Sequence, residues 1–378
     1  MKSMFTASVT NSLWLLALVL ALTPGAALGQ GSLTPPGAPA PTMKTLTQVE
    51  PRTPIDSLPC IIDQSGSYYL TSNLTAAPGV NGISVAADHV TIDLGGFALL
   101  GGGGAAAAGI NVPAAQRDLN VRNGTIASWS GQGILASNAH NSQFEHLRIA
   151  SNGSVGLQAG QACAIRDCVL EANQGDGINA AERCLIKDCE SSGNSNGFQV
   201  QGNGTRITDC VAADNTLTGI VVTGVIGTIT TCTATSNGQD GINVGSGCRV
   251  DQCTVIINGR HGIFTQDGCT VKNCTANGNV GDGIQVGLSC CWVNGNTTNG
   301  NVIGIHSTGN ARIDDNIVYS NGTGILCELN AGSFVVRNTA HSNNVSNYDV
   351  RGGNNFAMVV NNPGMGFANQ TPWSNFSY

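Results

Sequence analysis

A glycine followed by an apolar residue returns along this sequence at a nearly constant interval, 20 to 22 residues after Leu157 until the final repeat. A second apolar column shares the same drifting period, so the two columns together indicate one internal repeat. The first column is Ile83, Ile110, Ile134, Leu157, Ile178, Phe198, Ile220, Ile242, Ile263, Ile284, Ile305 and Ile325, with Tyr348 as its expected last member. The second column is Ile92, Val121, Phe144, Ile165, Ile186, Ile207, Ile229, Val250, Val271, Val293, Ile313 and Val336.

Within each repeat, short alternating segments predict strands, as in Ile178-Asn179-Ala180. A repeat of about 21 residues has room for three such strands, and each must pair with its equivalent in the next coil, about 4.8 Å away. The 51 glycines, together with only 10% charged residues, fit a chain with many tight turns. We therefore expect an all-β fold, a right-handed parallel β-helix of about 12 coils, with the handedness taken from the general crossover preference.

The two ends of the sequence differ from the repeats. Residues 1–29 predict a signal peptide, because Lys2 precedes the apolar run LWLLALVLAL and a small-x-small cleavage site follows it. Residues 30–55 are Pro-rich and predict a linker, residues 56–80 an N-terminal cap, residues 81–353 the β-helix, and residues 354–378 a C-terminal cap. We therefore expect a secreted, extracellular or periplasmic protein with no membrane span in its mature chain.

Polar and sulfur-containing columns accompany the apolar ones. Asn residues that recur four or five positions before the glycine column predict an Asn ladder at one turn. Two cysteine columns are expected to face the core, where neighbouring thiols would be close enough to form disulfides, although the sequence does not establish pairing. The cysteine spacing does not fit a zinc site, so no metal and no cofactor are expected. The longer cysteine column is Cys168, Cys189, Cys210, Cys232, Cys253 and Cys274.

The residue before each glycine of the repeat forms a further column that includes Asp240, His261 and Asp282. Stacking of three successive coils predicts the imidazole of His261 between two carboxylates about 9–10 Å apart, near the separation used by inverting glycosidases. An imidazole in that position would hold its proton more firmly. The alternative is that Asp before Gly is an ordinary turn residue whose carboxylate binds local backbone N–H groups.

A neighbouring stripe of outward side chains has the composition of a sugar-binding surface. Amides suit the binding of sugar hydroxyls, and an aromatic ring can stack on a pyranose face. The alternative is that outward amides simply keep a sheet face soluble. The candidate ligand-binding residues are Asn179, Gln199, Asn243, Arg260, Phe264, Gln285 and His306.

The repeated Gly-Asp-Gly-Ile and Asn-Gly turns over residues 82–350 resemble the parallel β-helix repeats of the pectin-lyase-like superfamily. More narrowly, PTMKTLTQVEPRTPI, SGSYYLTSNLT and the final TPWSNFSY look like secreted bacterial right-handed β-helix proteins. The resemblance implies an extracellular polysaccharide as ligand, since the superfamily includes pectate lyases, polygalacturonases, alginate epimerases and phage tailspikes. It does not carry over catalytic residues, because only Arg260-His261-Gly262 approaches a polygalacturonase motif and the outward stripe has no Lys to act as a lyase base.

These observations favour an exported protein that binds, or processes, polysaccharide along an outward strand face. The alternatives are a polysaccharide hydrolase or lyase that acts through Asp240, His261 and Asp282, and a purely structural surface or matrix protein. The formal net charge of −7 argues against nucleic acid as a partner.

Overall fold

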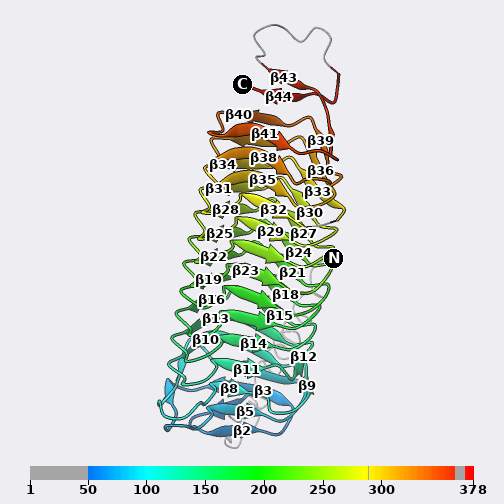
Figure 1. Ribbon diagram of the computed structural model, residues 1–378. Coiled ribbons are helices and arrows are strands. Elements are labelled where there is room, and N and C mark those ends of the chain that lie inside the picture. The colour runs from blue at the N-terminus through cyan, green and yellow to red at the C-terminus, as the bar shows by residue number, and fades with distance from the viewer. Residues whose placement is uncertain (1–49, 288, 362–370) are drawn as a thin grey trace, which may run out of the picture. The chain divides into compact units, whose positions relative to one another are not determined.

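The computed structural model describes residues 50–287, 289–361 and 371–378. The chain divides into two units, Met1–Pro51 and Arg52–Tyr378, and the second contains the strands. The expected signal peptide and most of the expected linker lie outside the described residues. Arg52–Tyr378 is built from strands wound into stacked coils, in which every strand pairs in parallel with its equivalent one coil away (Figure 1).

The apolar residues of the first column lie on one parallel sheet of 14 strands, here called sheet B. Ile178 pairs with Phe198 and Ile284 with Ile305, so the glycine-apolar repeat is the register of this sheet. Its strands are β2 (Cys60–Ile62), β5 (Ile83–Val85), β8 (Ile110–Asn111), β11 (Ile134–Ala136), β14 (Leu157–Ala159), β17 (Ile178–Ala180), β20 (Phe198–Val200), β23 (Ile220–Val222), β26 (Ile242–Val244), β29 (Ile263–Thr265), β32 (Ile284–Val286), β35 (Ile303–Ser307), β38 (Thr323–Cys327) and β41 (Ser346–Val350).

The other two strands of each coil belong to a 28-stranded sheet, here called sheet A, that bends sharply between them. Its first leg is β1 (Thr53–Ile55), β3 (Gly66–Leu70), β6 (Val90–Asp93), β10 (Asn120–Ala127), β13 (Gln143–Ala150), β15 (Ala164–Arg166), β18 (Leu185–Lys187), β21 (Arg206–Thr208), β24 (Thr228–Thr230), β27 (Arg249–Asp251), β30 (Thr270–Lys272), β33 (Cys291–Asn294), β36 (Ala311–Asp314), β39 (Phe334–Val336) and β42 (Asn355–Phe356). Its second leg is β4 (Leu74–Thr75), β7 (Ala98–Leu100), the later halves of β10 and β13, β16 (Val169–Glu171), β19 (Glu190–Ser192), β22 (Val211–Ala213), β25 (Thr233–Thr235), β28 (Thr254–Ile256), β31 (Thr275–Asn277), β34 (Thr297–Asn299), β37 (Ile317–Tyr319), β40 (Thr339–His341), β43 (Val359–Asn361) and β44 (Asn375–Ser377). A two-stranded sheet C joins β9 (Gln116–Arg117) and β12 (Ala139–His140).

Each coil turns its corners through single residues in the left-handed region. In one coil these residues are Arg183, Asp188 and Gly193, with φ of 58°, 51° and 65°. The residue after each of them, Cys184, Cys189 or Asn194, is buried, so every corner turns one side chain inward. Because each corner is made by one left-handed residue followed by one inward residue, the corners have the same length in successive coils, and the repeat keeps a nearly fixed length.

Both apolar columns are confirmed, with two differences. The second column ends at Val335, because Ile313 pairs with Val335 and Asp314 with Val336. Sheet B has 14 strands where about 12 coils were expected. One additional strand is β2, within residues 56–80. There Cys60 pairs with Ile83 and so occupies the first column, but it does not follow a glycine and therefore lacks the repeat motif.

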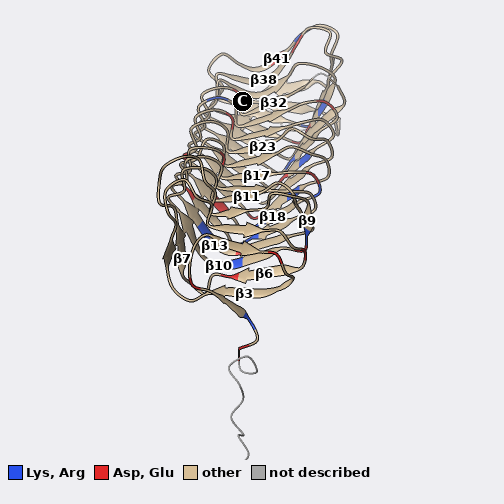
Figure 2. Cartoon of the chain, turned by 90° about the horizontal axis from the view of Figure 1, so that it is seen from below, with Lys and Arg blue, Asp and Glu red and all other residues tan. Residues whose placement is uncertain are grey.

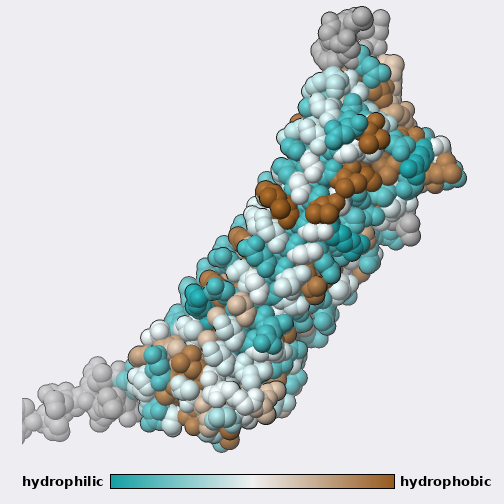
Figure 3. All heavy atoms as spheres, turned by 60° about the vertical axis from the view of Figure 1, so that its left-hand side comes forward, coloured by the Kyte–Doolittle hydropathy of each residue, from teal (hydrophilic) through white to brown (hydrophobic). Residues whose placement is uncertain are grey.

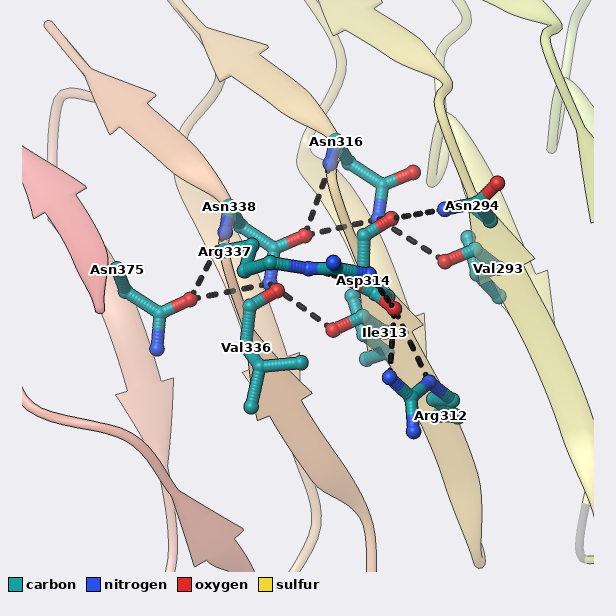
Figure 4. Close-up of polar contacts among 10 residues, drawn as sticks. All are labelled: Val293, Asn294, Arg312, Ile313, Asp314, Asn316, Val336, Arg337, Asn338 and Asn375. Atoms are coloured by element: carbon teal, nitrogen blue, oxygen red, sulfur yellow. Dashed lines mark hydrogen bonds and ion pairs between the residues drawn. The ribbon is translucent and has the colours of Figure 1, made fainter. Parts of the chain in front are cut away.

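The expected Asn ladder is present, and a second one accompanies it. In the first ladder, the Nδ2 of an Asn donates to the Oδ1 of the next, as from Asn237 to Asn258 at 2.9 Å, except at Asn194, whose Nδ2 donates to the Oγ of Ser191 at 3.0 Å. The second ladder occupies the bend of sheet A beyond the last cysteine of the longer column. It links Asn296, Asn316, Asn338 and Asn375 and fastens β44 to the last coils. Figure 4 shows its steps from Asn316 to Asn338 and from Asn338 to Asn375.

All fourteen cysteines are free thiols. Those of the two columns are buried, as expected from their inward positions, and their sulfurs donate to main-chain carbonyls, as from Cys184 to the carbonyl of Gly160 at 3.2 Å. Only Cys290 is exposed, and Cys60 is half-buried. The columns therefore act as packing in two corners of the coil.

Exposed apolar side chains concentrate toward the C-terminal coils, where they colour the upper part of Figure 3 brown. Val345, Val280 and Val302 are the most exposed valines, at 80%, 68% and 58%. Among the described residues there is no helix of the length and apolarity needed to cross a membrane.

Candidate functional site

Six of the seven predicted ligand-binding residues lie in one column on the outer face of sheet B, here called the sheet B stripe. They are Asn179, Gln199, Asn243, Phe264, Gln285 and His306. Each is half-buried between two inward-facing neighbours. Phe264 pairs with Asn243 on one side and with Gln285 on the other, and Gln285 pairs with His306. The structure therefore brings these residues together as the sequence predicted, with Val221 between Gln199 and Asn243.

Arg260, the seventh residue, lies in the turn before β29 and reaches the stripe from its edge. Its Cζ lies 5.6 Å above the centre of the Phe264 ring, and its Nη1 is 3.6 Å from Oδ2 of Asp240. The imidazole of His261 stacks on the same Phe264 ring, with centroids 5.9 Å apart and planes at 28°. Phe264 is thus the apolar centre of a small cluster with one guanidinium and one imidazole.

Asp240 has the contacts of a turn residue. Its Oδ1 accepts the main-chain N–H of His261 at 3.1 Å, and its Oδ2 accepts the Nδ2 of Asn243 at 3.0 Å. The residue is 1% exposed, so both oxygens are occupied and shielded from solvent. This geometry agrees with the alternative in which Asp before Gly binds local N–H groups.

His261 lies between Asp240 and Asp282 in the column, and its Nδ1 is 3.6 Å from Oδ2 of Asp282, but the imidazole hydrogen-bonds neither carboxylate. Its Nδ1 accepts the main-chain N–H of Asp282 at 3.1 Å, so the ring points along the column to the backbone of the next coil. The expectation that it holds its proton firmly is wrong, because burial lowers the pKa of His261 and the carboxylates of Asp282 and Asp240 offset that effect only in part. Arg260 and His306 lower this pKa further.

The imidazole that contacts two carboxylates at hydrogen-bond distance is that of His306, one coil beyond Asp282. Its Nδ1 lies 2.9 Å from Oδ2 of Asp282, and its Nε2 lies 3.3 Å from Oε1 of Glu328. Burial lowers the pKa of His306, but the hydrogen bonds and charges of Asp282 and Glu328 outweigh it and raise the pKa above its usual value. Arg351 binds the other oxygen of Glu328 and extends this chain of charges to a fourth coil.

Glu328 and Arg351 were not singled out from the sequence. Glu328 lies after β38, two residues beyond the outward Leu326, and contacts His306 because its side chain reaches back across the coil boundary. The sequence held one indication of this contact: Glu328 lies two residues after Leu326, which occupies the same outward column as His306 in the next coil. Strand alternation predicts which strand residues face outward, but it does not predict the direction of side chains in the turns.

The face around the stripe is shallow. Gln199 lines a depression of about 320 Å³ together with Gln201, Gly202, Thr223 and Gly224. Within residues 50–287, 289–361 and 371–378, no group of three or more His, Cys, Asp or Glu residues is arranged to hold a metal ion. An extended ligand laid across several coils suits such a face better than a small molecule held in a cavity.

Comparison with known proteins agrees with the fold. Residues 178–311 match the family model described as "Right handed beta helix region". No curated protein sequence matches the chain significantly.

Three similar solved structures are distant. The A-modules of the Azotobacter vinelandii mannuronan C-5 epimerases AlgE4 and AlgE6 give TM-scores of 0.49 and 0.48 at 13% identity; they cover 72% and 86% of this chain and 86% and 88% of their own chains. The Dettilon tailspike protein gives a TM-score of 0.39 at 11% identity, covering 75% of this chain and 60% of its own.

These similarities are too distant to assign an activity. The fold rests on the parallel register of the strands themselves and on the matched repeat region. The chain is a right-handed parallel β-helix protein.

Proposed function

We propose that this chain is an exported protein that binds extracellular polysaccharide along the sheet B stripe. The observation that carries the proposal is the in-register column of Asn243, Phe264, Gln285 and His306, in which an aromatic ring lies between amides on successive coils. Successive coils are about 4.8 Å apart, so a polymer lying along the column meets one side chain at each step.

The amides of the stripe have free hydrogen-bonding capacity. The side chains of Gln199 and Gln285 make no hydrogen bond within the described residues. Asn179 and Asn243 each donate once to an Asp at the adjacent turn, which leaves the Oδ1 of each free to accept a sugar hydroxyl. The amides of Asn179 and Asn243, which these bonds hold in place, lose little conformational freedom on binding, which favours a ligand with many hydroxyls.

Export is the second part of the proposal and rests on the segment 1–29, with its apolar run and its small-x-small cleavage site. The same proposal includes a linker at 30–55, an N-terminal cap at 56–80, a β-helix at 81–353 and a C-terminal cap at 354–378. Strand β1 lies at the end of the linker segment and β2 lies in the N-terminal cap segment, and both pair with strands that follow them, so the stack of strands already begins in these two segments.

The test is a glycan array with purified protein and with Phe264→Ala and Gln285→Ala, using Ile226→Ala at a remote exposed turn as the matched control. We expect both stripe variants to lose at least about tenfold in affinity for the polysaccharide bound by wild type, and Ile226→Ala to match wild type. Absence of binding by wild type, or equal binding by all four proteins, would overturn the proposal in favour of a structural role.

Catalysis through Asp240, His261 and Asp282 is the second candidate, and the proximity of Asp282 to both His261 and His306 favours it. Reducing-sugar and unsaturated-product assays on the glycan identified above would detect turnover. Turnover that is abolished by Asp240→Asn and Asp282→Asn would replace the binding proposal with an enzyme. Turnover that survives both substitutions would exclude these residues.

A further inference from the structure

Exposed aromatic rings line the outer face of sheet A near its C-terminal end. Trp292, Arg312 and Phe334 are neighbours on β33, β36 and β39, with Trp292 opposite Arg312 and Arg312 opposite Phe334. Both rings are 41% exposed, in a chain where only 5% of residues are aromatic. They lie two coils apart, about 9.6 Å by strand spacing, on the same side of the sheet.

A buried carboxylate fixes the arginines beside these rings. Asp314 accepts Nε and Nη2 of Arg312 at 3.0 and 2.8 Å, and Nε and Nη2 of Arg337 at 2.7 and 2.6 Å (Figure 4). The side chain of Asp314 is 1% exposed, whereas both arginine side chains are 43% exposed. The surface therefore presents guanidinium groups, and the carboxylate that holds them lies beneath.

Each guanidinium also lies over an exposed ring. The Cζ of Arg312 is 5.5 Å from the centre of Phe334, and that of Arg337 is 5.4 Å from the centre of Trp373, which is 50% exposed. Neither Nη1 group makes a hydrogen bond within the part of the chain that the structure describes. Rings and donors are thus held in place before any ligand arrives, which reduces the entropy lost on binding.

More basic residues continue along the same leg of sheet A. Arg249 pairs with Thr270, which pairs with Trp292, and Lys272 lies two residues after Thr270 on β30. Figure 2 shows Lys and Arg recurring coil after coil along one side of the stack. Arg249 is paired with Asp251, whereas Arg312 and Arg337 share the single carboxylate of Asp314. Two guanidinium groups over one carboxylate favour an anionic ligand over a neutral one.

We propose that Trp292, Arg312, Phe334, Arg337 and Trp373 form a second binding site, here called the sheet A platform, for an extended acidic polysaccharide. Sugar rings stack on Trp292 and Phe334, and sugar carboxylates face the free Nη1 groups of Arg312 and Arg337. The platform lies on a different sheet from the sheet B stripe and does not depend on it.

Tryptophan fluorescence separates the two sites, because Trp292 and Trp373 lie in the platform and the sheet B stripe has no tryptophan. Titration of purified protein with oligogalacturonate should change the emission, whereas neutral cello-oligosaccharides should not. We expect Phe334→Ala and Arg312→Gln to raise the Kd at least about tenfold, and Phe334→Tyr to stay near wild type because it keeps the ring.

Phe264→Ala is the control, and its titration curve should match that of wild type even if the sheet B stripe binds glycan. No emission change in wild type, an equal response to the neutral oligosaccharide, or unchanged Kd in Phe334→Ala would overturn the platform. A loss caused only by Phe264→Ala would also overturn it, while supporting the sheet B stripe. Circular dichroism of each variant establishes that the fold is retained.

Discussion

The Nδ1 of His306 lies 2.9 Å from Oδ2 of Asp282, which belongs to the preceding coil. Through its Nε2, the same imidazole reaches Glu328 of the following coil at 3.3 Å. One half-buried imidazole therefore ties three coils together with two carboxylates, and its charge state affects both the stability of these coils and the C-terminal end of the sheet B stripe.

The first prediction concerns the pH dependence of this tie. Because the pKa of His306 is raised in the folded chain, its stabilising effect is complete below the ordinary pKa of about 6.5 and is lost as pH rises through the higher folded value. We expect His306→Gln to cost about 2 kcal/mol at about pH 6 and much less at about pH 9. Urea unfolding at both pH values measures this, and a cost that does not change with pH would contradict the charged pair.

His261 should behave in the opposite way. Its pKa is lowered in the folded chain, chiefly by burial, so the unfolded chain takes up a proton that the folded chain does not as pH falls below about 6.5. Wild type should therefore lose stability on acidification at this residue, and His261→Gln should lose less over the same range. NMR titration of the two imidazoles would settle the assignment, and a higher pKa for His261 than for His306 would refute it.

The contrast between these two histidines shows what sequence can and cannot predict here. The repeat placed His261 and His306 in the correct columns, because strand alternation and the coil period determine which residues face outward. It did not predict that His261 would accept a backbone N–H while His306 binds two carboxylates. That difference depends on the rotamers of Asp282 and Glu328, which periodicity does not encode.

Departures from the repeat limited the prediction elsewhere. Val336 was placed in the core column instead of Val335, because the connection from Cys327 to Phe334 shifts the spacing. The second Asn ladder was missed because its last step, from Asn338 to Asn375, spans 37 residues of sequence instead of one coil. This ladder also continues the longer cysteine column: Asn296 occupies the position after Cys274, and the main-chain N–H of Cys274 donates to its Oδ1. The residue type therefore changes from Cys to Asn within one column.

The cysteine columns predict a simple pattern of thiol reactivity. Only Cys290 is exposed, and the column cysteines are buried, so a reagent in solution does not reach them. At Cys269 burial also raises the pKa to about 12, so this thiol is not ionised near neutral pH. We expect a maleimide to label Cys290 rapidly in the native protein, Cys60 slowly, and all fourteen cysteines in denaturant. Mass spectrometry counts the labels, and fewer than fourteen in denaturant would show that adjacent coils are joined by disulfides.

Asn258 tests the energetic role of the first Asn ladder. Its Oδ1 accepts the main-chain N–H and Nδ2 of Asn237 at 3.1 and 2.9 Å, and its Nδ2 donates to Asn279. Asn258→Ala leaves these buried groups without partners and should lower the free energy of unfolding by about 3 kcal/mol. Asn344→Ala, at an exposed position in a later turn, is the matched control and should change it by less than about 0.5 kcal/mol. Equal effects of the two substitutions in urea unfolding would show that the ladder adds no stability.

Arg312 and Arg337 should be strongly coupled through Asp314. Burial raises the pKa of Asp314, but the hydrogen bonds from Arg337 and Arg312 outweigh this and lower it, so the carboxylate is charged in the folded state above about pH 4. Either Arg312→Ala or Arg337→Ala leaves one guanidinium to neutralise it and should cost about 1 kcal/mol, whereas the double variant leaves a buried, unpaired charge and should cost about 3–5 kcal/mol. A double-mutant cycle in urea near neutral pH measures the coupling. Adding Asp314→Asn to the double variant should recover part of the lost free energy of unfolding, because it removes the buried charge. If the effects of the two single substitutions were strictly additive and Asp314→Asn recovered nothing, Asp314 would not hold the two arginines together.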